Sequence, residues 1–228
     1  MSSKNKFLFC ALISWFVLIC QYVLMIQNRV VSMPETTLRF FSFFTILTNV
    51  LVAIVFTTCF LKPKNIFNFF AMPSVQTAVA VYIFIVGFVY NVILRFLWKP
   101  TGLQQIVDEF LHLVIPIVYI LLWFFTVEKS FIKWNSFVLW LLYPLVYVSI
   151  ILVLGSFSNF YPYPFIDVSV LGYSIVLKNA LLLTLFFGLV SIVIIYVSKF
   201  QTKSKKSYIN QYSILHNINY SSIYELLF

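Results

Sequence analysis

Charge and glycine are scarce in this sequence of 228 residues, in which charged side chains make up 9% and glycine occurs five times. Soluble domains carry about 25% charged residues, so the composition excludes an ordinary soluble fold. Hydrophobic residues instead reach 62%, and the mean hydropathy is +1.01. Because a chain in lipid must satisfy every backbone hydrogen bond internally, long apolar runs favour helices. The composition predicts an all-α integral membrane protein.

The motifs of soluble enzymes are also missing. The three cysteines, Cys10, Cys20 and Cys59, lie inside apolar runs and show no CxxC spacing, which argues against a disulfide framework and a zinc site. The sequence has no glycine-rich phosphate loop, no GxSxG turn and no HExxH motif. We therefore expect no metal and no organic cofactor.

What the sequence has is six apolar stretches of the length that a membrane-spanning helix needs, about 17 to 25 residues. The first run is longer than the core of a signal peptide, so we expect it to remain as a helix. No linker divides the six, which predicts one six-helix transmembrane domain over residues 1–200, followed by a basic tail over residues 201–228 that is either disordered or lies on the membrane. The predicted spans are 7–26, 40–61, 77–94, 110–127, 137–154 and 175–197.

Basic residues outside the spans predict the orientation. With the amino terminus in the cytoplasm, ten of the fifteen Lys and Arg residues fall on that side. This bias predicts that both termini are cytoplasmic and that the protein is a multi-pass protein of the plasma (cytoplasmic) membrane. The dense basic cluster, residues 199–206, directly follows a span, so attraction to anionic lipid explains it and nucleic acid is not an expected partner. Membrane lipids are the expected partners.

Polar side chains inside the spans are candidates for a functional site. Thr45, Thr48 and Asn49 have the i, i+3, i+4 spacing of one helix face, and Asn91 and Arg95 form an i, i+4 pair. His112 is the one histidine within the apolar spans, four residues from Asp108 and from Pro116. An ionisable group inside a span suggests function and needs a partner. With the predicted orientation, these residues lie in the outer half of the bilayer, where we expect them to converge on one pocket that opens to the outer side of the membrane.

Such a pocket suits acyl transfer. A neutral imidazole can take a proton from a threonine hydroxyl and return it to a leaving group, while Asp108 or Glu109 orients the ring. Asn49 or Asn91 can donate a hydrogen bond to a developing oxyanion. Thr48 is a rival to Thr45, and threonine and asparagine in membrane helices also serve as simple interhelical hydrogen-bond partners.

Three segments carry a family resemblance: Phe44-Thr45-Ile46-Leu47-Thr48-Asn49, Leu111-His112-Leu113-Val114-Ile115-Pro116 and Tyr161-Pro162-Tyr163-Pro164-Phe165-Ile166-Asp167. In these, the chain resembles the bacterial Pr-six-Pr family of six-helix membrane proteins, for which no activity is established. More distantly, it is similar to the androgen-induced protein family of six-helix membrane hydrolases. That similarity implies Thr45 as nucleophile and His112 as base, although the sequence around His112 differs from the pattern of that family.

The leading hypothesis is therefore a threonine/histidine lipid-ester hydrolase, with Thr45 and His112 catalytic, Asp108 orienting, and Asn49 or Asn91 as oxyanion donor. The alternative is a non-catalytic protein that binds or moves lipid and grips a headgroup through Arg95, Asp167 and Lys178. Secondary transport is a third hypothesis, but the chain shows no internal repeat.

Overall fold

The computed structural model describes the backbone of residues 3–227 and the side chains of residues 4–204. It is all-α, and within this part of the chain six helices are long and apolar enough to cross a membrane. The prediction of six spans is thus confirmed; five of them are longer than predicted, and the second is shorter because it begins at Phe44 rather than at residue 40. The spans are Lys4–Gln27, Phe44–Leu61, Pro73–Leu97, Gly102–Thr126, Ser136–Ser158 and Val168–Ser204.

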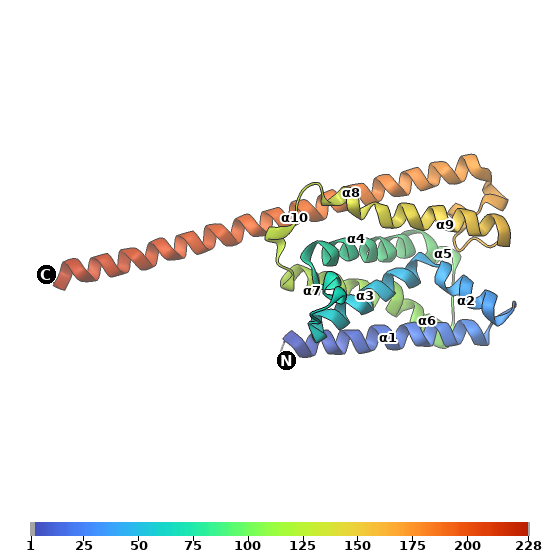
Figure 1. Ribbon diagram of the computed structural model, residues 1–228, viewed down its shortest axis with the longest axis horizontal. Helices are drawn as coiled ribbons and strands as arrows, with labels where there is room; N and C mark the ends of the chain where they lie inside the picture. The colour runs from blue at the N-terminus through green and yellow to red at the C-terminus, as the bar shows by residue number, and fades with distance from the viewer. Residues whose placement is uncertain (1–2, 228) are drawn as a thin grey trace.

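The helices form one bundle whose axes run roughly side by side (Figure 1). Helix α4 (Pro73–Val89) lies at the centre, where Ala80, Val81 and Ile83 are fully buried, and it contacts α3 (Phe44–Leu61), α7 (Ile115–Thr126) and α10 (Val168–Leu227). Helix α1 (Ser3–Gln27) packs mainly on α3, and α9 (Leu142–Ser158) packs on α10.

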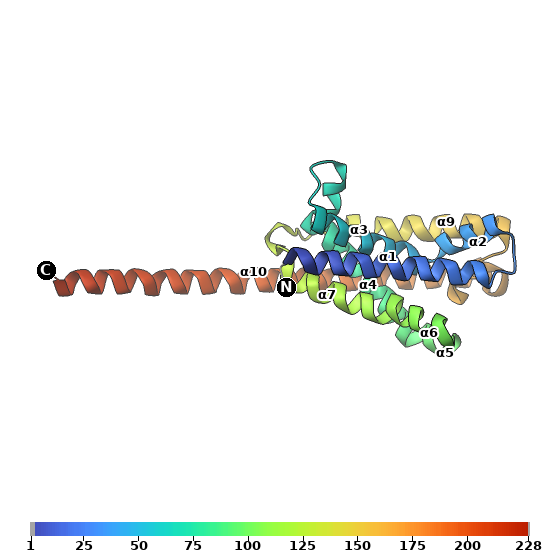
Figure 2. The ribbon, with the colours of Figure 1, turned by 90° about the horizontal axis from the view of Figure 1, so that it is seen from below.

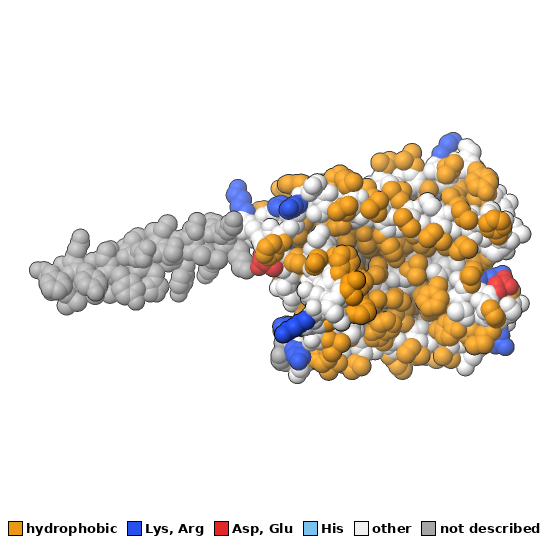
Figure 3. Space-filling view, in the orientation of Figure 1, with side chains coloured by type: hydrophobic (Ala, Val, Ile, Leu, Met, Phe, Trp, Pro, Cys, Tyr) orange, Lys and Arg blue, Asp and Glu red, His pale blue; other side chains and the backbone are white. Residues whose placement is uncertain are grey.

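The surface of the bundle matches a membrane protein. Apolar side chains cover its middle, and the basic and acidic side chains gather at its two ends (Figure 3). The amino terminus lies at the end from which α10 leaves the bundle (Figures 1 and 2). This arrangement places both termini of the spanning region at one end, as an even number of spans requires. Which side of a membrane that end faces remains a prediction.

The second span is interrupted, which the sequence analysis did not predict. A continuous helix over residues 40–61 was expected, but α2 (Met33–Ser42) ends at Ser42 and α3 begins at Phe44. Phe43 between them has extended backbone angles, φ −79° and ψ 124°. The first turn of α3 therefore lies inside the bundle, with backbone N–H groups that have no partner within the helix. Thr45 belongs to that turn.

Two other spans contain a wide π-helical turn. One turn, η2 (Tyr90–Leu94), separates α4 from the short α5 (Arg95–Leu97), and the other, η3 (Phe110–Val114), separates α6 (Gly102–Glu109) from α7. Such turns are frequent at functional sites because they leave backbone groups without their usual helical partners. The predicted span 110–127 missed all of α6, so His112 lies in the middle of this span rather than near its start.

The remaining elements are short. They are the 3₁₀ turns η1 (Ile66–Ala71), η4 (Lys129–Phe131) and η5 (Pro164–Ile166) and the helix α8 (Ser136–Trp140). Helix α10 is kinked at Gly172, whose φ of 72° favours glycine, and then continues to Leu227. The domain boundary predicted at residue 200 and the disorder of the tail stay predictions, since the side chains after Ser204 lie outside the described residues.

Candidate functional site

A cavity of about 580 Å³ lies at the end of the bundle opposite the amino terminus. Its walls are mostly apolar and come from α1, α2, α3, α5, α6, both π-helical turns and the loop between α9 and α10. The polar groups on it include Thr45, Asp108, His112, Tyr90 and Tyr163. The volume falls in the range of small-molecule and lipid sites, about 300 to 1,000 Å³.

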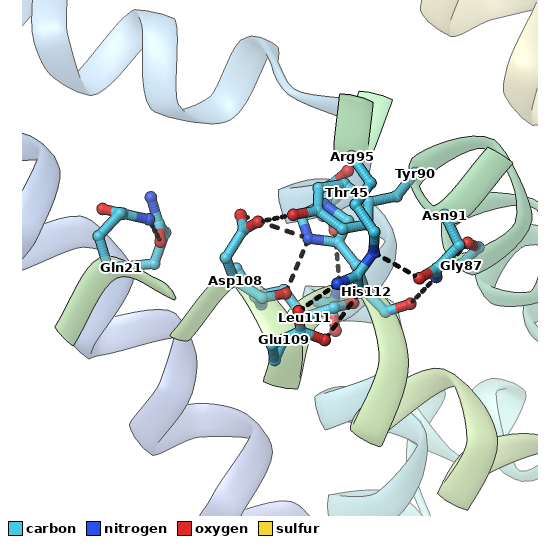
Figure 4. Close-up of polar contacts among 12 residues, drawn as sticks. Gln21, Thr45, Gly87, Tyr90, Asn91, Arg95, Asp108, Glu109, Leu111 and His112 are labelled. Carbon is cyan, nitrogen blue, oxygen red and sulfur yellow. Dashed lines mark hydrogen bonds and ion pairs between the residues drawn. The ribbon is translucent and has the colours of Figure 1, made fainter. Parts of the chain in front are cut away.

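His112 and Asp108 are in contact, as their spacing of four residues predicted (Figure 4). The His112 Nδ1 atom lies 2.9 Å from the backbone oxygen of Asp108 and 3.4 Å from its carboxylate Oδ1. The other carboxylate oxygen of Asp108 accepts a hydrogen bond from the Tyr90 hydroxyl. The Tyr90 ring also stacks on the imidazole, with centroids 3.8 Å apart and an interplanar angle of 11°. The ring of His112 is therefore held on its face and at one nitrogen.

These contacts determine which nitrogen of His112 carries the proton and which one can accept a proton or a hydrogen bond. A carbonyl oxygen only accepts hydrogen bonds, so the Nδ1 atom beside Asp108 carries the proton in the neutral ring. The lone pair of the neutral imidazole then lies on Nε2, which makes no hydrogen bond with any residue of the described chain. His112 is 8% exposed and lines the cavity. It thus offers an oriented base or hydrogen-bond acceptor to the cavity.

Both asparagines hold the π-helical turn η3 in place. Ile115 donates its N–H to Phe110, five residues back, so the Leu111 carbonyl loses its usual donor. Residue 116 is proline and has no N–H to offer the His112 carbonyl. Asn49 donates to Leu111 at 3.2 Å, and Asn91 donates to His112 at 3.2 Å.

The second N–H of each asparagine amide is also occupied. Asn49 donates to the Thr45 carbonyl at 2.9 Å, and Asn91 donates to the Gly87 carbonyl at 2.7 Å. An amide has two N–H donors, and these bonds use both. Neither asparagine has a free donor for an oxyanion, and neither lines the cavity with His112.

Thr45 does line that cavity, and its hydroxyl is bonded to Tyr163 rather than to His112. The Tyr163 hydroxyl accepts the backbone N–H of Thr45 at 3.1 Å and lies 3.3 Å from its Oγ1. No hydrogen bond joins Thr45 to His112 among the described residues. Thr48 is fully buried beside Tyr143, 3.5 Å from its hydroxyl, and is not part of the cavity wall.

The three residues expected to bind a lipid headgroup lie outside the cavity that His112 lines. Arg95 makes a two-point ion pair with Glu109, at 2.5 and 2.8 Å, beside the cavity. The carboxylate of Asp167 accepts from the N–H and hydroxyl of Ser169 at the start of α10, and Lys178 is exposed on that helix. None of these three lines the cavity.

Two tyrosines of the site were missed by the sequence analysis. Tyr90 and Tyr163 are two of fourteen tyrosines, and no spacing rule separates them from the others. Tyr163 belongs to the Tyr-Pro-Tyr-Pro segment noted for its resemblance, which was the one available signal. The described side chains contain no group of three His, Cys, Asp or Glu that could hold a metal ion.

The fold and the cavity define a class: a six-helix apolar bundle consistent with an integral membrane protein, with a histidine–aspartate pair lining a largely apolar cavity. A scan against protein-family models, a search of curated proteins and a search of solved structures each find no match for this chain.

Proposed function

We propose that this protein is a membrane-embedded lipid-ester hydrolase that uses Thr45 as nucleophile and His112 as base. One observation carries the proposal: His112, whose imidazole is oriented by Asp108 and has no hydrogen bond at Nε2, lines the same largely apolar cavity as Thr45. An oriented base and a hydroxyl on one cavity are the parts that nucleophilic catalysis requires. The similarity to the androgen-induced protein family implies the same two residues. The Pr-six-Pr family, which the chain also resembles, has no established activity, so the proposal goes beyond that resemblance.

The chemistry starts with proton transfer. His112 Nε2 takes the proton of Thr45, whose oxygen attacks the carbonyl carbon of an ester lipid. Asp108 stabilises the imidazolium that forms, and the scarcity of water in the cavity strengthens that interaction. Because the hydroxyl of Thr45 is engaged with Tyr163, the Thr45 and His112 side chains have to approach each other when a substrate binds, as apo sites often require.

Thr45 is the preferred nucleophile over Thr48. Thr45 is 8% exposed and faces the cavity, whereas Thr48 has no exposed surface and lies beside Tyr143. A nucleophile has to reach its substrate, so the rival position suits a structural hydrogen bond better.

A non-catalytic lipid-binding or lipid-transport protein is the second candidate. The observation in its favour is that Thr45 and His112 make no hydrogen bond to each other while the cavity is largely apolar. In that case the polar contacts of the lipid come from cavity residues such as Gln21, Gln104 and Asn28 rather than from Arg95, Asp167 and Lys178. We place the protein in the plasma membrane with both termini in the cytoplasm and the cavity in the outer half.

The test is ester hydrolysis by the full-length protein, purified and reconstituted in lipid nanodiscs. Turnover of a long-chain p-nitrophenyl ester is expected in the native protein and is expected to fall by at least about 1,000-fold in Thr45→Ala and in His112→Ala. Thr45→Ser should keep turnover, because it keeps the hydroxyl. Thr126→Ala, at the opposite end of the bundle, is the matched control. Native turnover in Thr45→Ala would reject the proposed nucleophile, and tight lipid binding without turnover would favour the second candidate.

A further inference from the structure

The proposed reaction creates a negative charge that needs a hydrogen-bond donor. When the oxygen of Thr45 attacks an ester, the carbonyl oxygen becomes an oxyanion, and removing one oxyanion donor in an enzyme costs about 100- to 1,000-fold in kcat. The expected donors, Asn49 and Asn91, have both N–H groups bonded to backbone carbonyls. The donor has to come from another residue next to Thr45.

The Tyr163 hydroxyl is next to Thr45. It lies 3.3 Å from Oγ1 and 3.1 Å from the backbone nitrogen, so it contacts the proposed reacting atom directly. Tyr163 is 9% exposed although it belongs to the loop between α9 and α10. Burial raises the pKa of this phenol above its ordinary value of about 10, so it keeps its proton at neutral pH.

The local structure fixes this phenol in place. Its ring stacks on Phe165 at 5.3 Å and 4°, and packs edge-on against Phe43 at 5.8 Å. Pro162 and Pro164 on either side restrict the backbone of the loop. A donor held by packing needs little reorganisation when charge develops, which is what makes such a donor effective.

The interruption of the second span explains why the phenol docks here. Thr45 lies in the first turn of α3, where backbone N–H groups have no helical partner, and the Tyr163 oxygen accepts one of them. Because that oxygen accepts the N–H, its own proton is free to be donated towards Thr45 Oγ1. The positive end of the α3 dipole points to the same place and favours negative charge there.

We propose that the Tyr163 hydroxyl is the oxyanion donor for the reaction at Thr45, a role that rests on the proposed function. As the bond between Thr45 Oγ1 and the carbonyl carbon forms, the electron pair of the carbonyl moves to its oxygen. The proton of Thr45 passes to His112 Nε2, and the Tyr163 O–H turns from Oγ1 to the oxyanion. When the intermediate collapses, the bond to the leaving alcohol breaks and that oxygen takes the proton from His112.

Thr45 and Tyr163 border two cavities of unequal size. Thr45 and Tyr163 also line a second, smaller cavity of about 80 Å³, whose other walls come from α4, α9 and α10. The pair thus stands between two apolar chambers. The larger cavity has room for an acyl chain bound at Thr45, and the smaller one has room only for a short group.

The experiment compares Tyr163→Phe with the native protein in the same nanodisc assay. Turnover number and KM are measured for the long-chain p-nitrophenyl ester. We expect kcat to fall about 100- to 1,000-fold with KM changed by less than about threefold, because the lost bond strengthens only in the transition state. The matched control is Tyr119→Phe, which removes a buried phenol that donates to the Gln76 carbonyl at 2.9 Å and lines neither cavity. Its kcat should stay within about threefold of the native value.

A second variant covers the case in which Tyr163→Phe does not fold. Trifluorotyrosine at position 163 keeps the ring and its hydrogen bonds but acidifies the phenol, so turnover should be lost at a lower pH than in the native protein. The role of Tyr163 would be overturned by a native kcat in Tyr163→Phe, or by a fluorinated protein that loses turnover at the same alkaline pH as the native protein. Loss of activity in Thr45→Ala would still support the proposed function in either case. Absence of turnover in the native protein, or full turnover in Thr45→Ala, would overturn both.

Discussion

Replacing Asn91 with alanine should destabilise the bundle because the backbone carbonyl of His112 loses its hydrogen-bond donor. The His112 carbonyl lies at the point where helix α7 would supply an N–H from residue 116, but that residue is Pro116. Asn91, on the neighbouring span, supplies the donor instead, with Nδ2 at 3.2 Å from the His112 oxygen. Asn91→Ala therefore leaves a carbonyl without this partner in an apolar surrounding, where water does not replace it.

The size of the effect follows from the bonds removed. An interhelical hydrogen bond in a membrane contributes about 0.6 kcal/mol on average and about 1.7 at most. A buried acceptor left unsatisfied costs about 1 to 3 kcal/mol. We expect the free energy of unfolding to fall by about 1 to 2 kcal/mol in Asn91→Ala. The native and variant proteins can be compared by reversible unfolding in mixed micelles with increasing SDS, followed by circular dichroism.

A double-mutant cycle tests the reason as well as the size. Pro116→Ala restores a backbone N–H that can bond to the His112 carbonyl. Asn91→Ala should therefore lower the free energy of unfolding by about 1 kcal/mol less in the Pro116→Ala background than in the native background. The cycle cancels whatever Pro116→Ala does by itself. If Asn91→Ala lowers the free energy of unfolding equally in both backgrounds, Asn91 does not substitute for the N–H that Pro116 lacks.

Three further substitutions have defined outcomes. Gly87→Ala places a Cβ 3.1 Å from the His112 carbonyl, so we expect a loss of about 1 to 3 kcal/mol in the same SDS titration. Gly155→Ala drives a Cβ into the ring of Tyr161, and the α9–α10 loop should become more accessible to limited proteolysis, whereas native protection would contradict that contact. Lys129→Met removes an ammonium that donates to three carbonyls at the end of α7, at 2.7 to 3.1 Å, and should lower the melting temperature by several degrees.

The contact between Asp108 and His112 was predictable because it depends only on helical spacing. Residues four apart on a helix are neighbours whatever the rest of the chain does. The ends of the spans were less predictable. Gly102–Glu109 was missed as helix because its mixed polar sequence has low mean hydropathy, while in the structure one side of it packs on α1 and carries the buried Asp108.

The roles of the two asparagines could not be read from the sequence. Their side chains satisfy carbonyls of a π-helical turn on another span, and neither the turn nor the pairing has a sequence pattern of its own. The position of Tyr163 beside Thr45 is a contact over 118 positions in the chain. Local periodicity carries no information about such pairs, which depend on how the helices pack.

The sequence by itself determined that this chain is a six-helix membrane bundle, because burying so many apolar side chains in lipid leaves helices as the way to satisfy the backbone. It also predicted, from the spacing of four residues, that Asp108 lies on the same helix face as His112. Only the tertiary structure decided what surrounds that pair: the break at Phe43, the stacked ring of Tyr90, the phenol of Tyr163 and the shared cavity. Those features arise where separate helices meet, and there the packing between helices, rather than the order of residues along one of them, sets the geometry.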